Sequence, residues 1–321
     1  MEKMKIVFMG TPDFAVASLD AIVKAGYNVA AVVTVPDKPA GRGQKLSVSA
    51  VKEYALAHNL PILQPEKLKD ENFLSALKQL NADVFVVVAF RMLPEVVWSM
   101  PPKGTFNLHG SLLPQYRGAA PINRAIMNGE KETGVTTFLI EKEIDTGKIL
   151  FSEKIQIGEN ETAGEIHDRL MMIGGELVVK TLHAIETNTY QQTEQHEFVK
   201  EGMLLNAAPK MFKDDCRTDW NKPIDNIHNH IRGLSPYPNA FTEFVSPAGE
   251  KYSVKLFHCE KVLKEHSLES GTITSDNRTY IYIAAKGGFI SVKELQLSGK
   301  KKLPVKDFLL GFKIEGNWIA G

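Results

Sequence analysis

The sequence predicts an α/β protein with a mostly parallel sheet in its first part and a small β-barrel in its last part. Apolar strands alternate with helices over the first half of the chain, and short β-like runs separated by turn residues fill the last third. A polar stretch without periodicity lies between these two parts. A length of 321 residues is enough for two hydrophobic cores, so we expect two domains of different architecture.

The alternation begins at the N-terminus. Lys5–Met9 is expected to be a short buried strand that ends at Gly10. Thr11 and Pro12 are expected to open a helix, with Thr11 as its N-cap. The next expected elements, in chain order, are strand Asn28–Val35, helix Val48–Asn59, strand Pro61–Leu63, helix Glu71–Leu80, strands Asp83–Ala89 and Thr105–Leu108, helix Ile122–Met127, and strands Gly134–Glu141 and Lys148–Ile157. Such an order, with strands of nearly continuous Val and Ile, is typical of a Rossmann-like parallel sheet covered on both faces.

A long helix and a polar stretch end the first part. Thr162–Glu186 is expected to be helical, with Thr162 as cap and Glu165 three residues later, which is a capping-box pattern. Beyond it the apolar periodicity disappears. We therefore predict a first domain at residues 1–188, a linker at 189–206 and a second domain at 207–321.

The second domain is expected to be a barrel. A predicted helix at Ile224–Arg232 precedes five short β-like runs with turn residues between them. These runs are Phe241–Val245, Tyr252–Cys259, Gly271–Thr274, Tyr280–Ala284 and Phe289–Leu297. Five short strands of this kind are typical of an OB-like fold.

Composition narrows the class of protein. The longest apolar runs, such as Val84–Phe90, have the length of a strand and are too short to cross a bilayer. The first five residues lead directly into a strand without a targeting pattern, so we expect the cytoplasm and no membrane partner. Net charge is zero, but residues 206–321 carry 17 Lys and Arg against 13 Asp and Glu. That excess is either chance scatter on a solvated surface or a surface that holds a polyanion.

The first turn argues against one large class of enzymes. Gly10 follows the first strand, where a dinucleotide-binding fingerprint would lie, but the second and third glycines of that fingerprint are missing. A nicotinamide-dependent oxidoreductase is therefore poorly supported.

Two polar residues at the end of a later strand are better candidates. Asn107 and His109 are two positions apart, so both side chains leave the same face, while Leu108 points into the core. The carboxyl ends of parallel strands are where open α/β sheets bind ligands. A single His is more often structural, but the shared face favours a site.

Asp145 is a third candidate. It lies in Ile144–Gly147, between two predicted strands. By itself, Asp-Thr-Gly indicates a tight turn. An aspartic protease would need a second such aspartate and a β-rich fold, and the sequence has neither.

These residues belong to motifs that resemble a known family. Asn107–Ala120 (NLHGSLLPQYRGAA), followed by Asp145–Gly147 (DTG), resembles the folate-dependent formyltransferases. Gly10–Ala15 (GTPDFA) and Pro36–Leu46 (PDKPAGRGQKL) are similar to the branch of that family that formylates methionyl-tRNA. The similarity continues in Arg217–Trp220, Ile231–Pro238 and Gly299–Leu310, so it covers nearly the whole chain.

The resemblance implies a reaction and three catalytic residues. The chain would transfer the formyl group of 10-formyltetrahydrofolate to the α-amine of initiator methionyl-tRNA, in translation initiation and without a metal. Asn107 would donate a hydrogen bond to the developing oxyanion, an interaction worth about 3 kcal/mol. His109 would move a proton, because imidazole titrates near neutral pH. Asp145 would hold the imidazole tautomer and stabilise its cationic form.

The resemblance also implies binding residues. Ser111, Leu112, Leu113 and Pro114 would line the folate pocket, since an apolar corner suits a flat pterin. The alternative is a corner that only packs.

For tRNA, the resemblance implies Arg42, with Lys45 and Lys210 as further phosphate contacts. Pro and Gly predict a loop at Pro39–Lys45, and a solvated charge cluster is the alternative there. We expect a monomer whose partners are the initiator tRNA and the folate.

Two other functions stay open at this point. Ala89–Pro94 is one residue shorter than in the methionyl-tRNA branch and resembles the segment in formyltransferases that act on sugar nucleotides. An amino-sugar nucleotide is therefore an alternative acceptor, although GTPDFA and the Arg42 loop argue against it. A non-catalytic folate- or RNA-binding module is the alternative of another class, and it predicts an incomplete set of catalytic residues.

Overall fold

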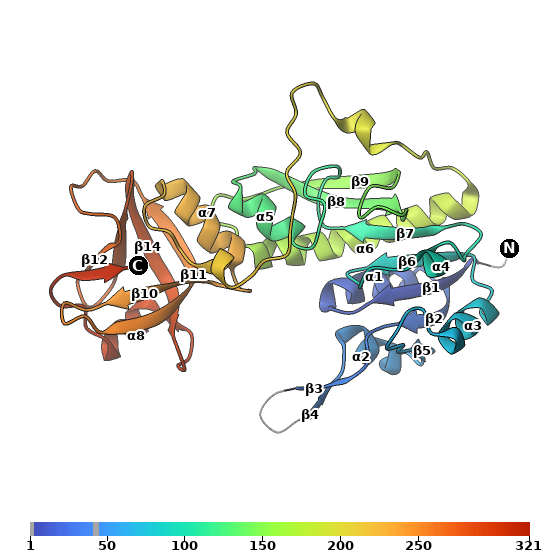
Figure 1. The fold of residues 1–321 in the computed structure, drawn as a ribbon, viewed down its shortest axis with the longest axis horizontal. Coiled ribbons are helices and arrows are strands. Elements are labelled where there is room, and N and C mark those ends of the chain that lie inside the picture. Colours follow the sequence, from blue (N-terminus) through green and yellow to red (C-terminus); the bar gives the residue numbers. More distant parts are fainter. Residues whose placement is uncertain (1–2, 41–44) are drawn as a thin grey trace. The chain divides into compact units, whose positions relative to one another are not determined.

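A computed structural model describes residues 3–40 and 45–321 (Figure 1). The chain forms two compact units. Unit 1 comprises Met1–Gly118, Gly134–Ile155 and His167–Ala207. Unit 2 comprises Ala119–Thr133, Gln156–Ile166 and Ala208–Gly321.

The elements predicted for the first part of the chain occur in the predicted order, with three short elements added at Lys38–Ala40, Lys45–Ser47 and Glu95–Trp98. They are β1 (Lys5–Gly10), α1 (Asp13–Lys24), β2 (Asn28–Val33), β3 (Lys38–Ala40), β4 (Lys45–Ser47), α2 (Ala50–Ala57), β5 (Ile62–Leu63), α3 (Glu71–Gln79), β6 (Val84–Val88), α4 (Glu95–Trp98), β7 (Thr105–His109), α5 (Pro121–Met127), β8 (Glu132–Leu139), β9 (Ile149–Gln156) and α6 (Ala163–Thr187). They form a seven-stranded sheet in the order β5-β2-β1-β6-β7-β8-β9. Strands β5, β2, β1, β6 and β7 are parallel, and β8 runs antiparallel to β7. The predicted Rossmann-like, mostly parallel sheet is confirmed.

The sheet is fixed by buried strands and by helix packing. All five residues of β6 are buried because this strand lies between β1 and β7 in the sheet. On β7, Leu108 is 3% exposed, and a Cβ placed on Gly174 of α6 would lie 2.7 Å from Leu108 Cδ2. The helix can therefore approach the strand closely only because residue 174 has no side chain. This contact commits Leu108 to the core and turns Asn107 and His109 to the other face.

Two predicted helix starts have different outcomes. The capping box is confirmed: the backbone N–H of Thr162 donates to Glu165 Oε2 (2.8 Å), and the backbone N–H of Glu165 donates to Thr162 Oγ1 (3.3 Å). The prediction of Thr11 as the N-cap of the first helix is wrong. Pro12 occupies that position with an extended backbone, and no side chain caps α1. The helix starts one residue later than the sequence suggested because Pro12 is outside it and not in its first turn.

The predicted basic loop is partly a hairpin. Strands β3 and β4 pair antiparallel, with Lys38 opposite Ser47 and Ala40 opposite Lys45. Each strand has three residues, too few for an alternating pattern to show in the sequence. Arg42 lies outside the described residues.

The last part of the chain is a closed antiparallel barrel. The 3₁₀ helix η1 (Gln195–Phe198), which precedes this part, belongs to unit 1. The elements that follow are the 3₁₀ helix η2 (Asp214–Cys216), helices α7 (Ile224–Leu234) and α8 (Val305–Gly311), and strands β10 (Ala240–Val245), β11 (Lys251–Val262), β12 (Thr272–Ser275), β13 (Ile281–Ala285), β14 (Gly288–Leu297), β15 (Leu303–Pro304) and β16 (Trp318–Ala320). The sheet runs β11-β10-β16-β12-β13-β14, and pairing of β11 with β14 closes it. The barrel prediction is confirmed, with a sixth strand, β16, that the sequence did not reveal.

The missed strand completes the wall. Strand β16 pairs with both β10 and β12, so it fills the gap between them. Trp318 is 7% exposed and belongs to the core of unit 2, whereas Ile319 on the same strand is 47% exposed. Three residues, of which one inserts an aromatic ring, are enough to close a barrel but too few to predict it.

Trp318→Ala is expected to destabilise unit 2 by about 3–5 kcal/mol, because it removes a buried ring next to Tyr252 and Phe312. Ile319→Ala is the matched control and is expected to cost about 1 kcal/mol at most. Denaturant unfolding followed by near-UV circular dichroism measures both. Equal losses for the two variants would contradict the assigned core position of Trp318.

Candidate active site

The candidate site is built on the carboxyl end of β7. Asn107 and His109 pair with Phe138 and Thr136 of β8, and they occupy alternate positions on one face of the sheet. Since β7 is the last strand of the parallel part of the sheet, its end lies where ligands bind in open α/β sheets.

Asp145 comes from the connection between β8 and β9. Its φ of 55° lies in the left-handed region, which Asp tolerates better than most residues. Gly147 allows this turn, because a Cβ there would lie 1.7 Å from the carbonyl oxygen of Leu139. The Asp-Thr-Gly sequence thus folds as a tight turn that aims the Asp145 carboxylate toward β7.

The imidazole of His109 is held from both sides. Its side chain is buried, and Nε2 lies 2.8 Å from the carbonyl oxygen of Tyr116. A carbonyl oxygen only accepts hydrogen bonds, so Nε2 carries the hydrogen and Nδ1 is the basic nitrogen. Nδ1 lies 3.9 Å from Asp145 Oδ2. This separation is longer than a hydrogen bond but short enough for the carboxylate to stabilise a protonated ring.

In the structure, the two roles predicted for Asp145 belong to two different groups. The Tyr116 carbonyl, and not Asp145, sets the tautomer of His109. Asp145 Oδ2 instead accepts a hydrogen bond from the backbone N–H of Gly118 at 2.9 Å, which fixes the carboxylate beside the ring. The Tyr116 contact could not be predicted because it uses a backbone group.

Asn107 has an unused hydrogen-bonding atom. Its Oδ1 is buried, and none of the described residues offers it a partner. Leaving a buried amide oxygen unpaired costs about 1–3 kcal/mol, so such an atom indicates a group that a ligand supplies. The donor set of a carboxamide, an imidazole and a carboxylate fits a ligand that exchanges protons and presents an N–H.

The predicted folate corner is mostly buried. Ser111 and Leu113 are 0% and 4% exposed, and Leu113 packs with Phe138 and Ile149. Ser111 Oγ donates to the carbonyl oxygen of Gln115 at 2.6 Å, inside the corner itself. The remaining two predicted residues are the half-buried Leu112 and the buried Pro114. The side chains of Ser111 and Leu113 thus build the corner, and contact with folate stays a prediction.

The shortened segment Ala89–Pro94 follows β6. Its Arg91 folds back onto the preceding part of the chain, where Nη1 donates to the carbonyl oxygen of Glu66 at 2.8 Å. Whether this segment shapes the folate pocket stays a prediction.

The two described residues that were predicted to contact tRNA belong to different units. Lys45 lies in β4 of unit 1. Lys210 is an exposed residue of unit 2, with Nζ 5.9 Å from the centre of the Phe212 ring. Phe212 is itself 66% exposed, so this pair presents a cation and an apolar ring to solvent.

Gln195 contacts the Asp145 turn, and the sequence did not predict this. It lies in η1, within the segment predicted as a linker, and is 3% exposed. Its Nε2 donates to the carbonyl oxygens of Asp145 and Gly147, each at 2.8 Å. Its Oε1 accepts from Arg117 Nε (3.0 Å) and Nη2 (2.6 Å). A glutamine in a polar stretch gives no pattern that could have revealed this contact.

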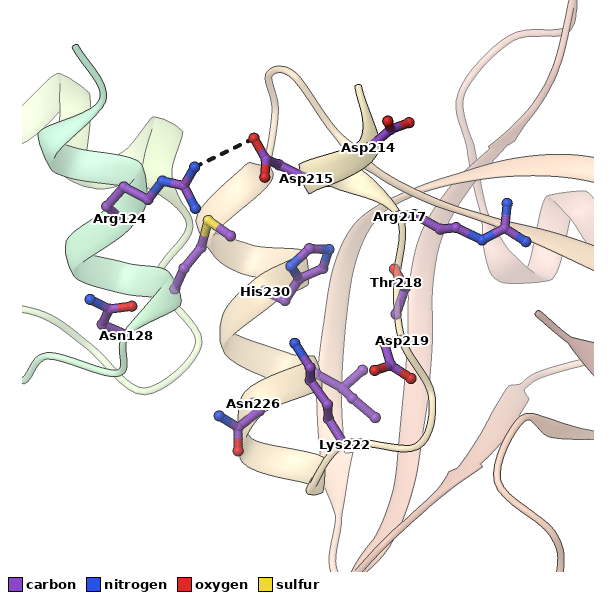
Figure 2. Close-up of a pocket in the computed structure, with 12 residues that line it drawn as sticks. Arg124, Asn128, Asp214, Asp215, Arg217, Thr218, Asp219, Lys222, Asn226 and His230 are labelled. Carbon is purple, nitrogen blue, oxygen red and sulfur yellow. Dashed lines mark hydrogen bonds and ion pairs between the residues drawn. The ribbon is translucent and has the colours of Figure 1, made fainter. Parts of the chain in front are cut away.

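A separate cavity lies in unit 2, between α5, α7 and the segment around η2 (Figure 2). Its volume is about 370 Å³. Its lining balances three cations against three carboxylates: Arg124, Arg217, Lys222, Asp214, Asp215 and Asp219. Arg124 Nη2 lies 3.5 Å from Asp215 Oδ2, and burial lowers the pKa of the His230 imidazole, which favours its neutral form. A charge-balanced lining does not favour an anion, and the cavity holds none of the predicted site residues.

Residues 3–40 and 45–321 contain no cluster of three or more His, Cys, Asp or Glu arranged to hold a metal ion. The same residues include no helix that is long and apolar enough to cross a membrane.

Comparison with known proteins identifies the class of enzyme to which this fold belongs. The chain belongs to the formyl transferase family: the model of the formyl transferase domain matches residues 4–182, and that of the formyl transferase C-terminal domain matches residues 210–313. The resemblance seen in the sequence is confirmed.

Two of the relatives to which the chain is similar are methionyl-tRNA formyltransferases. The chain is 53% identical to the methionyl-tRNA formyltransferase of Bacteroides thetaiotaomicron, over 99% of this chain and 98% of that protein. It is 56% identical to the methionyl-tRNA formyltransferase of Azobacteroides pseudotrichonymphae, over 96% of each chain.

Solved structures share the fold at low identity. An N-formyltransferase from Helicobacter canadensis, in complex with folinic acid and dTDP-3-aminofucose, has a TM-score of 0.63 at 22% identity, over 94% of this chain and all of that one. HypX from Aquifex aeolicus, in complex with tetrahydrofolic acid, has a TM-score of 0.64 at 18% identity, over 96% of this chain and 47% of that one. These likenesses bear on architecture alone.

Asn107→Ala is expected to lower kcat by about 10²–10³-fold, because it removes a hydrogen-bond donor to the developing negative charge. Asn72→Ala, at an exposed position of α3, is the matched control and is expected to leave kcat unchanged. Steady-state kinetics of formyl transfer measures both variants. A rise in KM at constant kcat for Asn107→Ala would show that the residue only binds and does not stabilise the transition state.

Proposed function

We propose that this enzyme transfers the formyl group of 10-formyltetrahydrofolate to the α-amino group of initiator methionyl-tRNA, in translation initiation. The observation that carries the proposal is the pairing of His109 with Asp145 beside an Asn107 oxygen that lacks a partner in the described chain. More than half-identity to methionyl-tRNA formyltransferases along almost the whole chain supports this choice of acceptor. The folate supplies a one-carbon unit that an amine can attack.

Asn107 has two tasks in this proposal. Its Nδ2 donates a hydrogen bond to the oxygen on which negative charge develops, an interaction worth about 3 kcal/mol. Its Oδ1, which is buried and otherwise unpaired among the described residues, accepts an N–H of the attacking amine and orients the nitrogen lone pair. One carboxamide thus pairs with both reacting partners.

His109 is the proton carrier. Nε2 stays bonded to the Tyr116 carbonyl, so a proton taken from the amine goes to Nδ1. There it lies next to the Asp145 carboxylate, which stabilises the cationic ring. The same proton is then available to the nitrogen that leaves. Burial of His109 strengthens these electrostatic interactions, because the surroundings screen them less than water does.

The corner Ser111–Pro114 borders the folate, and residues 1–188, 189–206 and 207–321 are the catalytic domain, the linker and an OB-like domain that holds tRNA. Arg42, Lys45 and Lys210 contact its phosphates. The enzyme acts as a monomer in the cytoplasm, and size-exclusion chromatography with light scattering tests the monomer.

An amino-sugar nucleotide is the second candidate acceptor. The Helicobacter canadensis enzyme, solved with dTDP-3-aminofucose, shares the fold, and the shortened Ala89–Pro94 segment resembles enzymes of that kind. Labelled 10-formyltetrahydrofolate, offered with methionyl-tRNA or with an amino-sugar nucleotide, separates the two. Label on methionyl-tRNA supports the proposal, and label only on the sugar overturns it. Transfer to neither acceptor would favour a non-catalytic binding module.

The logarithm of the tRNA affinity is expected to fall linearly with the logarithm of the salt concentration, because phosphate contacts release counterions. Lys45→Ala is expected to reduce the slope by about 1. Lys103→Ala, at an exposed position outside the predicted contacts, is the control and is expected to leave the slope unchanged. Filter binding from about 50 to about 200 mM salt measures the slope, and a flat response would remove the phosphate contacts from the proposal.

A further inference from the structure

The Asp145 turn is held by a side chain from far along the chain. The carboxamide of Gln195 bonds to both carbonyl oxygens that flank Thr146, and its own oxygen receives two N–H groups of Arg117. Two donors and two acceptor lone pairs are all that a glutamine side chain has, so its capacity is used completely. The residue is 3% exposed, and no part of it is left for solvent.

Residues that follow Gln195 in the chain bind the loop that contains Gln115 and Tyr116. Gln115 Nε2 donates to the carbonyl oxygen of Leu204, and Gln115 Oε1 accepts from the backbone N–H of Asn206, each at 2.8 Å. The backbone N–H of Tyr116 donates to the carbonyl oxygen of Asn206 at 2.7 Å. Residues 195, 204 and 206 therefore bind residues 115–117. This loop, continued to Gly118, supplies the backbone groups that touch the catalytic side chains.

There are two such backbone groups. The carbonyl of Tyr116 bonds His109, and the N–H of Gly118 bonds Asp145. Gln195 reaches this arrangement twice, through the Asp145 turn and through Arg117, so the turn and the loop cannot move apart without breaking its hydrogen bonds.

We propose that Gln195 is a positioning residue of the active site, which keeps the Asp145 carboxylate in place beside His109. This inference rests on the proposed formyl transfer. Its physical basis is the 3.9 Å separation of Asp145 Oδ2 and His109 Nδ1, at which a small outward shift weakens the attraction between the carboxylate and the protonated ring. Loss of Gln195 would leave two turn carbonyls and the Arg117 guanidinium without their partner, and the turn would relax outward.

The test compares Gln195→Ala with Gln192→Ala, an exposed glutamine of the same segment. We expect Gln195→Ala to lower kcat by about 10²-fold, since a misplacement of about 1 Å costs that much, and to change KM for either substrate less than about threefold. Gln192→Ala should match the wild type. The concentration of folded sites is set by titration with tetrahydrofolate, so that misfolded protein does not enter kcat. If Gln195→Ala does not fold, Gln195→Met, which keeps the length of the side chain, takes its place.

The decisive step is a double-mutant cycle with Asp145→Asn. If Gln195 acts through Asp145, adding Gln195→Ala to Asp145→Asn lowers kcat less than about threefold further. A full, multiplicative loss in the double variant would overturn the proposal, as would wild-type kcat in Gln195→Ala. The wild type is assayed alongside with each acceptor. An enzyme that formylates only the sugar would overturn the proposed acceptor and still allow the cycle to be measured.

Discussion

The hydrogen bond from His109 Nε2 to the carbonyl of Tyr116 is the contact on which the site depends. It fixes which ring nitrogen is basic and points that nitrogen at Asp145. Because Tyr116 lies between Leu113 and Gly118, the same short loop carries the corner predicted for folate at one end and the donor to Asp145 at the other. Placement of this loop therefore decides the orientation of the acid-base pair and its distance from the corner.

The loop is also held from outside. The side chain of Gln115 and the backbone N–H of Tyr116 bond to residues 204 and 206, and Arg117 bonds to Gln195, all of them beyond the end of α6. A segment predicted to connect two domains is thus part of unit 1. A polar stretch without periodicity can stabilise a fold when it forms hydrogen bonds with backbone groups that no helix or strand reaches.

Unit 2 shows a similar dependence on remote pieces of chain. Its barrel is closed by three residues near the C-terminus, and its contacts extend to α5 and to the first turn of α6. Gly233 of α7 has no side chain where a Cβ would lie 3.0 Å from the backbone nitrogen of Met127, so α5 and α7 pack closely. In both units, segments that are far apart in the sequence are therefore in contact.

The sequence by itself determined the order of the longer strands and helices of the first part, the presence of a barrel, the capping box of α6, and the face shared by Asn107 and His109, because these follow from local periodicity and residue type. Tertiary structure decided the rest. The Tyr116 carbonyl, the Gly118 N–H and the clamp of Gln195 are backbone groups and a polar side chain brought together from distant segments, and no residue pattern encodes such meetings. Strand β16 escaped for the same reason, since its two partners, and not its three residues, make it a strand.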